Sequence, residues 1–171
     1  MEIKEFLSKA GVHFEIHQHA PVFTAQRMAA VEHERSRYVA KPVIIKADSR
    51  YLMCVLPASR HVNLARLKTP LAAQAVELAK EREIAELFPD CDVGAEPPFG
   101  NLYGLPTLMD KALKRDDHIL FQAGTHEAAI RISMRDYQKL VEPQVLDFSH
   151  RTSLRQRLSA LLSRLTDYWA K

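Results

Sequence analysis

The spacing of apolar residues predicts the first elements of the chain. Apolar residues between positions 3 and 10 recur at helical spacing, so a helix is expected there. Residues 12–19 alternate strictly between apolar and polar side chains, which is typical of a half-buried strand. Pro21 interrupts that strand, and Thr24 is placed to cap a short helix over residues 25–33.

The centre of the chain predicts a hairpin. Residues 39–47 and 51–57 are two apolar runs joined by three turn-forming residues, so we expect them to pair in the core of a sheet. The stretch 70–88 allows two interpretations: one long helix that starts at Thr69-Pro70, or two helices that flank a short strand at 75–79. We favour the second interpretation.

The second half of the chain combines a rigid loop with further strands. Residues 91–106 hold three glycines and three prolines, which predicts an ordered loop with special backbone angles. Strands are expected at 106–110, 118–123 and 128–134, and a helix at 135–141. Because strands and helices are intermixed without a regular strand–helix–strand cadence, we expect an α+β fold with a largely antiparallel or mixed sheet.

The composition indicates one globular domain. The chain has 171 residues, of which 47% are hydrophobic and 26% charged, enough to bury a full core. Its apolar runs fall well short of the roughly 20 residues that span a bilayer, so no membrane association is expected. Cys54 and Cys91 cannot form a disulfide framework and lack metal-ligand spacing, so the expected location is the reducing cytoplasm.

The net charge of +3 is concentrated near the C-terminus. Residues 149–171 carry five basic residues and one acidic residue, so residues 1–148 are nearly neutral. Between positions 154 and 169, leucines recur at helical spacing with arginines between them, which predicts a basic amphipathic helix. We therefore divide the chain into a body, 1–148, and a helix, 149–171. This helix packs on the body, pairs two copies into a homodimer or binds RNA.

Familiar catalytic motifs are missing from the sequence, so candidate sites rest on single features. His13, His17 and His19 share one face of the first predicted strand, where they form either a polar outer surface or, with a further ligand, a metal site. Cys54 lies in an apolar strand and is expected to be a buried small hydrophobe. Cys91 lies between two aspartates, which disfavour a reactive thiolate.

Three further features carry polar chemistry. Lys41 lies in an apolar strand, where a fixed cation could hold a phosphate or stabilise an oxyanion, or could guard a sheet edge. Residues 94–100 hold a stiff Pro-Pro flanked by glycines, so this segment either grips a small polar group with its backbone or simply connects two elements. His126 lies in a turn after a strand and either orders a water near an ester or is a surface histidine.

Taken together, these features follow an order that is similar to one family. The order is His19-Ala20-Pro21-x-x-Thr24, Ala40-Lys41, Gly94-x-x-Pro97-Pro98-Phe99-Gly100, Asp110 and Ala123-Gly124-x-His126. It resembles the YbaK/prolyl-tRNA synthetase-associated editing-domain superfamily over about residues 3–145. The Lys, G-x-x-x-P and A-G-x-H elements are weak signals singly, and specific in this order and spacing.

The resemblance implies a barrel-like mixed sheet flanked by helices and the activity of a trans-acting aminoacyl-tRNA deacylase. Such enzymes hydrolyse the ester between a wrong amino acid and the 3′ adenosine of a mischarged tRNA, without a metal, cofactor or protein nucleophile. The resemblance implies that Lys41 and His126 act in catalysis. The residues implied to bind substrate are Phe23, Thr24, Gly94, Pro97, Pro98, Phe99, Gly100 and Gly124.

The sequence departs from the family pattern at one informative place. Pro42 follows Lys41, where several family members carry a polar residue, so the hydrogen bond of that residue is missing here. The alternative to an enzyme is a non-catalytic module that binds tRNA, a nucleotide or an amino acid on the same fold.

Overall fold

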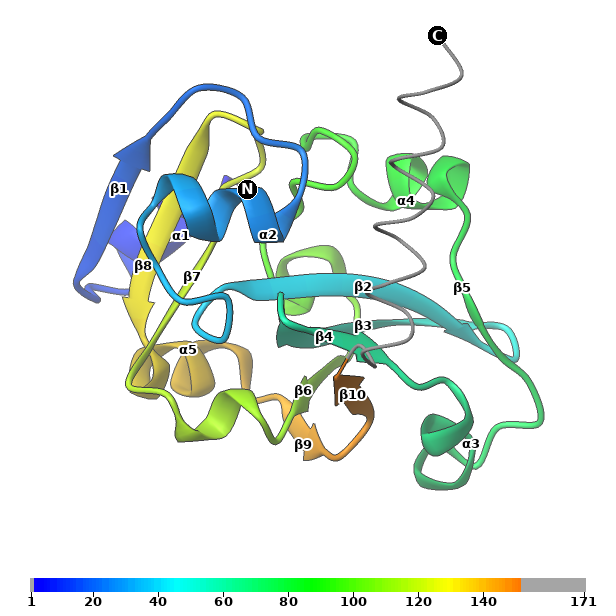
Figure 1. Ribbon diagram of the computed structural model, residues 1–171. Helices are drawn as coiled ribbons and strands as arrows, with labels where there is room; N and C mark the ends of the chain where they lie inside the picture. Colours follow the sequence, from blue (N-terminus) through cyan, green and yellow to red (C-terminus); the bar gives the residue numbers. More distant parts are fainter. Residues whose placement is uncertain (1, 152–171) are drawn as a thin grey trace, which may run out of the picture.

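The computed structural model describes residues 2–151 (Figure 1). Its helices are α1 (Ile3–Lys9), α2 (Ala25–Val31), α3 (Ala65–Leu71), α4 (Glu81–Leu87) and α5 (Met134–Val141), with short 3-10 turns η1 (Gly100–Tyr103) and η2 (Leu113–Arg115). Its strands are β1 (Phe14–Gln18), β2 (Ala40–Ala47), β3 (Arg50–Pro57), β4 (Arg60–Val62), β5 (Val76–Leu78), β6 (Thr107–Asp110), β7 (His118–Gln122), β8 (Ala128–Ser133), β9 (Gln144–Leu146) and β10 (Ser149–Arg151).

The strands form three sheets. The largest has the order β5-β2-β3-β6-β9, the second β1-β8-β7, and the third pairs β10 with β4. The predicted hairpin is confirmed: β2 and β3 pair antiparallel, from Ala40 opposite Pro57 to Ala47 opposite Arg50. The β3–β6 and β6–β9 ladders are parallel. The α+β class with a mixed sheet is therefore confirmed.

The expected barrel-like closure is wrong. Figure 1 shows β1, β7 and β8 on one side of the molecule and β2 crossing its centre. In the described part of the chain, the two larger sheets are joined by one isolated bridge between Val39 and Leu120, without a continuous ladder. A barrel needs hydrogen bonding around its whole circumference, and here the sheets meet instead at a seam beside the start of β2.

Alternation along β2 and β3 gives the central sheet two apolar faces. Ile44 and Val55 belong to a core that includes Phe99, Phe121 and Tyr137. The intervening residues, such as Ile45 and Cys54, face a second core with Leu67 and Phe148. A third cluster fixes α2 through Met28 and Ala29 against Val39 and Leu120. Burial of a Met, Val or Leu side chain stabilises a fold by about 1.5–3 kcal/mol. The side chains of Met28, Val39 and Leu120 therefore hold the seam between the sheets together.

In the ambiguous stretch 70–88, the strand and the second helix of the favoured interpretation are confirmed as β5 and α4, whereas the first helix, α3, already ends at Leu71. Pro70 does not begin a helix; it lies within the last turn of α3. The short strands β9 and β10 were not expected, because three residues are too few to show an alternating pattern.

The C-terminal prediction needs one correction. Residues 149–151, which we assigned to the basic helix, form β10 and pair with β4. The remainder of that predicted helix, and the homodimer contact assigned to it, lie outside the described residues. Of the helices that the structure describes, none is long and apolar enough to cross a membrane.

Candidate active site

A pocket of about 270 Å³ lies at the seam where α2, the start of β2, the loop after Gly94 and β7 meet. Four of the residues that line it are candidate site residues from the sequence: Phe23, Thr24, Lys41 and Gly94. The residues that complete the lining are Ala25, Gln26, Met28, Ala40, Pro42, Glu96 and Gln122. Segments far apart in the sequence thus converge on one hollow, and Lys41 and the Gly94 loop share it.

Lys41 supplies the cationic group of this pocket. Its ammonium donates a hydrogen bond to the carbonyl oxygen of Arg60 at 3.0 Å. Burial lowers the pKa of Lys41 below its ordinary value of 10.5, because the charged form loses hydration. An ammonium has three donors, so the geometry leaves donor capacity for an oxygen of a ligand.

The loop that carries Gly94 is fixed along its length. Gly94 has a φ of +90°, in the region that favours glycine. Its N–H donates to Glu96 Oε1 at 2.8 Å, and the Ala95 carbonyl accepts from the N–H of Gly124 at 2.9 Å. At the far end, the buried hydroxyl of Tyr137 donates to the Pro98 carbonyl at 2.9 Å. The backbone groups facing the pocket are therefore held in place before any ligand binds.

His126 borders the pocket without being one of its lining residues. Its ring lies 4.7 Å from that of Phe23, centroid to centroid. Gln122 Nε2 donates to the Val22 carbonyl at 2.7 Å and lies 3.2 Å from His126 Nδ1. Because an amide nitrogen only donates, Nδ1 is the acceptor, and a neutral His126 carries its proton on Nε2. His126 therefore keeps an Nε2–H donor beside the pocket.

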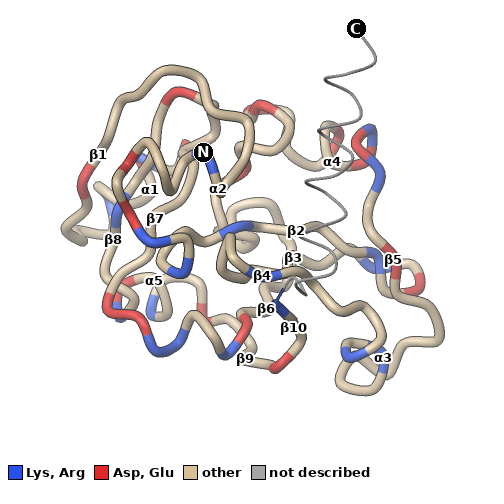
Figure 2. The backbone as a smooth tube through the Cα atoms, in the orientation of Figure 1, with Lys and Arg blue, Asp and Glu red and all other residues tan. Residues whose placement is uncertain are grey.

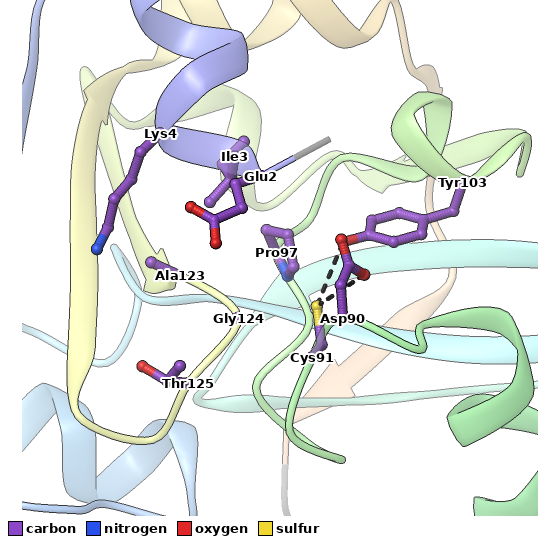
Figure 3. A pocket seen from close by; sticks show the side chains of 10 residues that line it. All are labelled: Glu2, Ile3, Lys4, Asp90, Cys91, Pro97, Tyr103, Ala123, Gly124 and Thr125. Atoms are coloured by element: carbon purple, nitrogen blue, oxygen red, sulfur yellow. Dashed lines mark hydrogen bonds between the residues drawn. The ribbon is translucent and has the colours of Figure 1, made fainter.

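The remaining predicted residues support the loop from behind. Pro97 and Gly124 line a smaller pocket of about 90 Å³ beneath α1, together with Cys91 and Tyr103 (Figure 3). Pro98 and Phe99 are buried, and Phe99 packs in the main core. The Thr24 hydroxyl accepts from the N–H of Arg27 and caps α2, as predicted.

Replacing Gly100 with alanine should destabilise the protein by about 2–3 kcal/mol. A Cβ at this position would lie 2.5 Å from Thr107 Oγ1 and 2.7 Å from the backbone oxygen of Leu105, which cannot swing aside. Urea denaturation would measure the change. Gly11→Ala is the control: Gly11 has a φ of +66° and open space around it. Its cost is backbone strain alone, about 1 kcal/mol. Equal costs for both variants would contradict a packing role for Gly100.

Sequence reasoning missed Glu96 and Gln122. Both are buried polar side chains, 6% exposed each, and both face the pocket. Glu96 lies inside the glycine–proline motif. The signal in the sequence was a charged residue in a segment whose other residues set the backbone conformation. Gln122 ends an apolar strand. Its partner Val22 comes from a distant segment, and His126 lies in the turn that follows the strand.

The strand histidines do not assemble a metal site. His17 is hydrogen-bonded to Glu32, and His19 Nδ1 contacts the Ala20 carbonyl at 2.9 Å. Within residues 2–151, no group of three or more His, Cys, Asp or Glu side chains is placed to hold a metal ion. Burial raises the pKa of Cys54 to about 12 and that of Cys91 to about 11, so neither thiol is an activated nucleophile.

Comparison with known proteins gives this geometry a family. The sequence profile of the family described as "Aminoacyl-tRNA editing domain" matches residues 19–140, which include every element around the pocket. The chain belongs to the aminoacyl-tRNA editing domain family. The predicted resemblance is therefore confirmed, and the pocket is the candidate active site of an editing domain.

Relatives of this editing domain extend over most of the chain. A curated protein of Escherichia coli, the "Multifunctional Ser/Thr-tRNA deacylase ProXp-y", is 25% identical over 147 residues, which cover 83% of this chain and 87% of the relative. The solved structure of hypothetical protein APE2540 shares the fold with a TM-score of 0.80 at 20% identity, covering 88% of this chain and 100% of that one. A structure described as a candidate trans-editing enzyme for prolyl tRNA synthetase gives 0.77 at 19% identity, covering 86% and 94%.

Proposed function

We propose that the protein is a trans-acting deacylase that hydrolyses the ester between a wrong amino acid and the 3′ adenosine of a tRNA. The observation that carries this proposal is the shared pocket: Lys41 and the rigid loop at Gly94 line one hollow in a chain of the editing family. A tRNA substrate also fits the cytoplasmic location expected from the sequence.

Hydrolysis of the aminoacyl ester depends more on positioning a water than on a strong protein nucleophile. A water oxygen adds to the ester carbonyl, the carbonyl oxygen becomes an oxyanion, and the bond to the ribose oxygen then breaks. The attacking water loses a proton and the ribose oxygen takes one up, so the products are a free amino acid and a deacylated tRNA. An aminoacyl ester is an activated acyl group, so orienting the water and stabilising one oxyanion can provide the rate.

Residues in and beside the pocket can each serve a step of this reaction. Lys41 offers the positive charge for the oxyanion or for the terminal phosphate. The carboxylate of Glu96 keeps acceptor capacity beyond its bond to Gly94 and suits the α-ammonium of the aminoacyl group. His126 offers an Nε2–H donor, and Gln122 holds it there. Thr24 and Phe23 close the side formed by α2.

Deacylation of a panel of mischarged tRNAs tests the proposal. The name of the Escherichia coli relative makes Ser- and Thr-charged tRNAs the first substrates, followed by Ala- and Cys-charged ones. We expect at least one ester to be cleaved well above the rate without enzyme. A methyl or hydroxyl difference changes selectivity by about 1–3 kcal/mol, so the preferred ester should exceed its neighbours by roughly tenfold or more. Binding of tRNA without turnover on a broad panel would favour the non-catalytic module instead.

A further inference from the structure

A second pocket of about 270 Å³, rich in basic residues, adjoins the candidate active site. Its walls come from the end of β3, the paired strands β4 and β10, and the segment 110–116 between β6 and β7. Figure 2 shows the blue segments of this region gathered below the start of β2. The basic side chains that line it are Arg37, Arg60, Lys111, Arg115 and Arg151.

Two carboxylates also line this basic pocket, and they leave its positive charge in excess. Asp110 is fully buried and accepts hydrogen bonds from the backbone N–H groups of Ala112, Phe148 and Ser149 at 2.8–3.0 Å. Its charge is thus held by the backbone. Asp116 lies 3.6 Å from Arg37 Nε and is the other acidic lining residue. The basic side chains therefore outnumber the carboxylates by five to two.

The strand pairing places two of these arginines directly opposite each other. In the antiparallel ladder of β4 and β10, Arg60 faces Arg151. Like charges at opposed positions destabilise a strand pair. Arg60 is nevertheless fixed there, because its guanidinium donates to Ser149 Oγ at 2.5 Å and to the Ser149 carbonyl at 3.0 Å. An anion bound between the two side chains would offset their repulsion.

Asp116 suits a ligand that carries hydrogen-bond donors as well as negative charge. Its side chain is 5% exposed, and in the described part of the chain its Oδ2 is buried without a hydrogen-bond partner. A buried acceptor left unsatisfied is costly. An ionised phosphodiester has no donor for this oxygen, whereas a ribonucleotide brings hydroxyl and amino hydrogens along with its phosphate.

One hydrogen bond links residues of the two pockets. The ammonium of Lys41, which lines the active-site pocket, donates to the carbonyl of Arg60, which lines the basic pocket. Ala40 lines the first pocket and its strand partner Pro57 lines the second. The protein's own residues 152–171 are a poor complement to the basic pocket, because they carry four basic residues and one acidic residue.

We propose that the basic pocket binds the nucleotides that precede the terminal adenosine of the tRNA. In this arrangement, Arg115 and Arg151 contact backbone phosphates, and Asp116 accepts a hydrogen bond from a ribose hydroxyl or a base amino group. The proposal rests on the proposed deacylase function, since the ester at the Lys41 pocket sets where the preceding nucleotides lie.

Binding of a single-stranded RNA ending in CCA to the full-length protein tests the proposal without requiring turnover. We expect the double variant Arg115→Gln, Arg151→Gln to weaken binding about tenfold or more at low salt, because two phosphate contacts are lost. The slope of log affinity against log salt should fall by about 0.7 for each lost contact. The control is Lys9→Gln, Arg82→Gln, which removes the same charge from exposed residues on α1 and α4. Equal affinities and slopes for the two double variants would overturn the proposal.

Asp116→Ala separates a nucleotide from a bare anion. Removing a negative charge from a basic pocket should strengthen the binding of any simple anion. If Asp116 accepts a hydrogen bond from the RNA, the variant instead binds the RNA several-fold more weakly. Stronger RNA binding by Asp116→Ala would remove this contact from the proposal.

Kinetics distinguish the basic pocket from the chemistry. With Arg115→Gln, Arg151→Gln, KM for aminoacyl-tRNA should rise about tenfold, while hydrolysis of the matching aminoacyl-adenosine, which lacks the preceding phosphates, keeps its wild-type rate. An equal loss on both esters would overturn the assignment to the preceding nucleotides. If the wild-type protein cleaves neither ester, the deacylase proposal fails, and RNA binding still decides the function of the basic pocket.

Discussion

Replacing Lys41 with alanine should lower kcat/KM for deacylation by about a hundredfold to a thousandfold, the effect of removing one preorganised donor from an oxyanion. The ammonium is held on a rigid strand by its bond to the Arg60 carbonyl, so it needs no reorganisation when charge develops on the substrate. Burial strengthens its field, because fewer waters screen it. Steady-state kinetics on the best ester of the panel would measure the loss.

Lys46→Ala is the matched control, since Lys46 lies on the same strand and its ammonium is 3.7 Å from a Glu83 carboxylate oxygen, away from the pocket. Its kcat/KM should stay near wild type. A pH profile adds a second readout: because burial lowers the pKa of Lys41, the enzymatic rate should fall on the alkaline side at a pH below 10.5. Unchanged kcat/KM in the alanine variant would remove Lys41 from the reaction.

Replacing Asp110 with alanine should lower the free energy of unfolding by about 3–5 kcal/mol. The three backbone N–H groups that donate to this carboxylate would lose their acceptor, and two of them belong to the buried residues Phe148 and Ser149. Phe148 precedes β10 and Ser149 is its first residue, so the link between β6 and the β4–β10 pair would loosen. Chemical denaturation would measure the loss.

Asp147→Ala is the control for Asp110→Ala. Its carboxylate is 42% exposed and forms surface ion pairs with Arg66 and Lys111, so its removal should cost less than about 1 kcal/mol. Asp110→Asn, which keeps one acceptor oxygen, should fall between the two. A cost for Asp110→Ala as small as that for Asp147→Ala would show that water satisfies the exposed N–H groups.

The loss at Asp110 should also reach the active site. Ser149 holds the guanidinium of Arg60, and the carbonyl of Arg60 holds Lys41. We therefore expect Asp110→Asn to have a lower kcat/KM for deacylation than Asp147→Ala, measured under conditions in which both variants are fully folded.

Sequence patterns predicted what depends on local structure. The alternation in β2 and β3 predicted the hairpin, and the Thr24 cap predicted the start of α2, because both need only near neighbours. The family order singled out Phe23, Thr24, Lys41 and Gly94, and the structure brings these four residues to one pocket. The motif also led us to expect substrate contacts from Pro98, Phe99 and Gly100. These residues are instead buried in the core beneath the loop, which the motif does not reveal.

What the sequence did not reveal depends on distant contacts. Whether the sheets close into a barrel is decided by hydrogen bonds between β7 and residues before β2, about 80 positions apart in the chain, and a single bridge forms there. Gln122 is fixed at the site by the carbonyl of Val22, which lies 100 positions earlier in the chain. The like-charged pair of Arg60 and Arg151 requires the register of a strand too short to be seen in the sequence.

The environment of the two cysteines has a practical consequence. The chain has only Cys54 and Cys91, and burial keeps both as neutral thiols at physiological pH. Maleimides and similar reagents attack the thiolate, so both native positions react slowly. A cysteine introduced at an exposed position such as Thr125, next to the active-site wall, would be labelled first. A fluorophore or spin probe can therefore be placed beside the pocket without first replacing the natural cysteines.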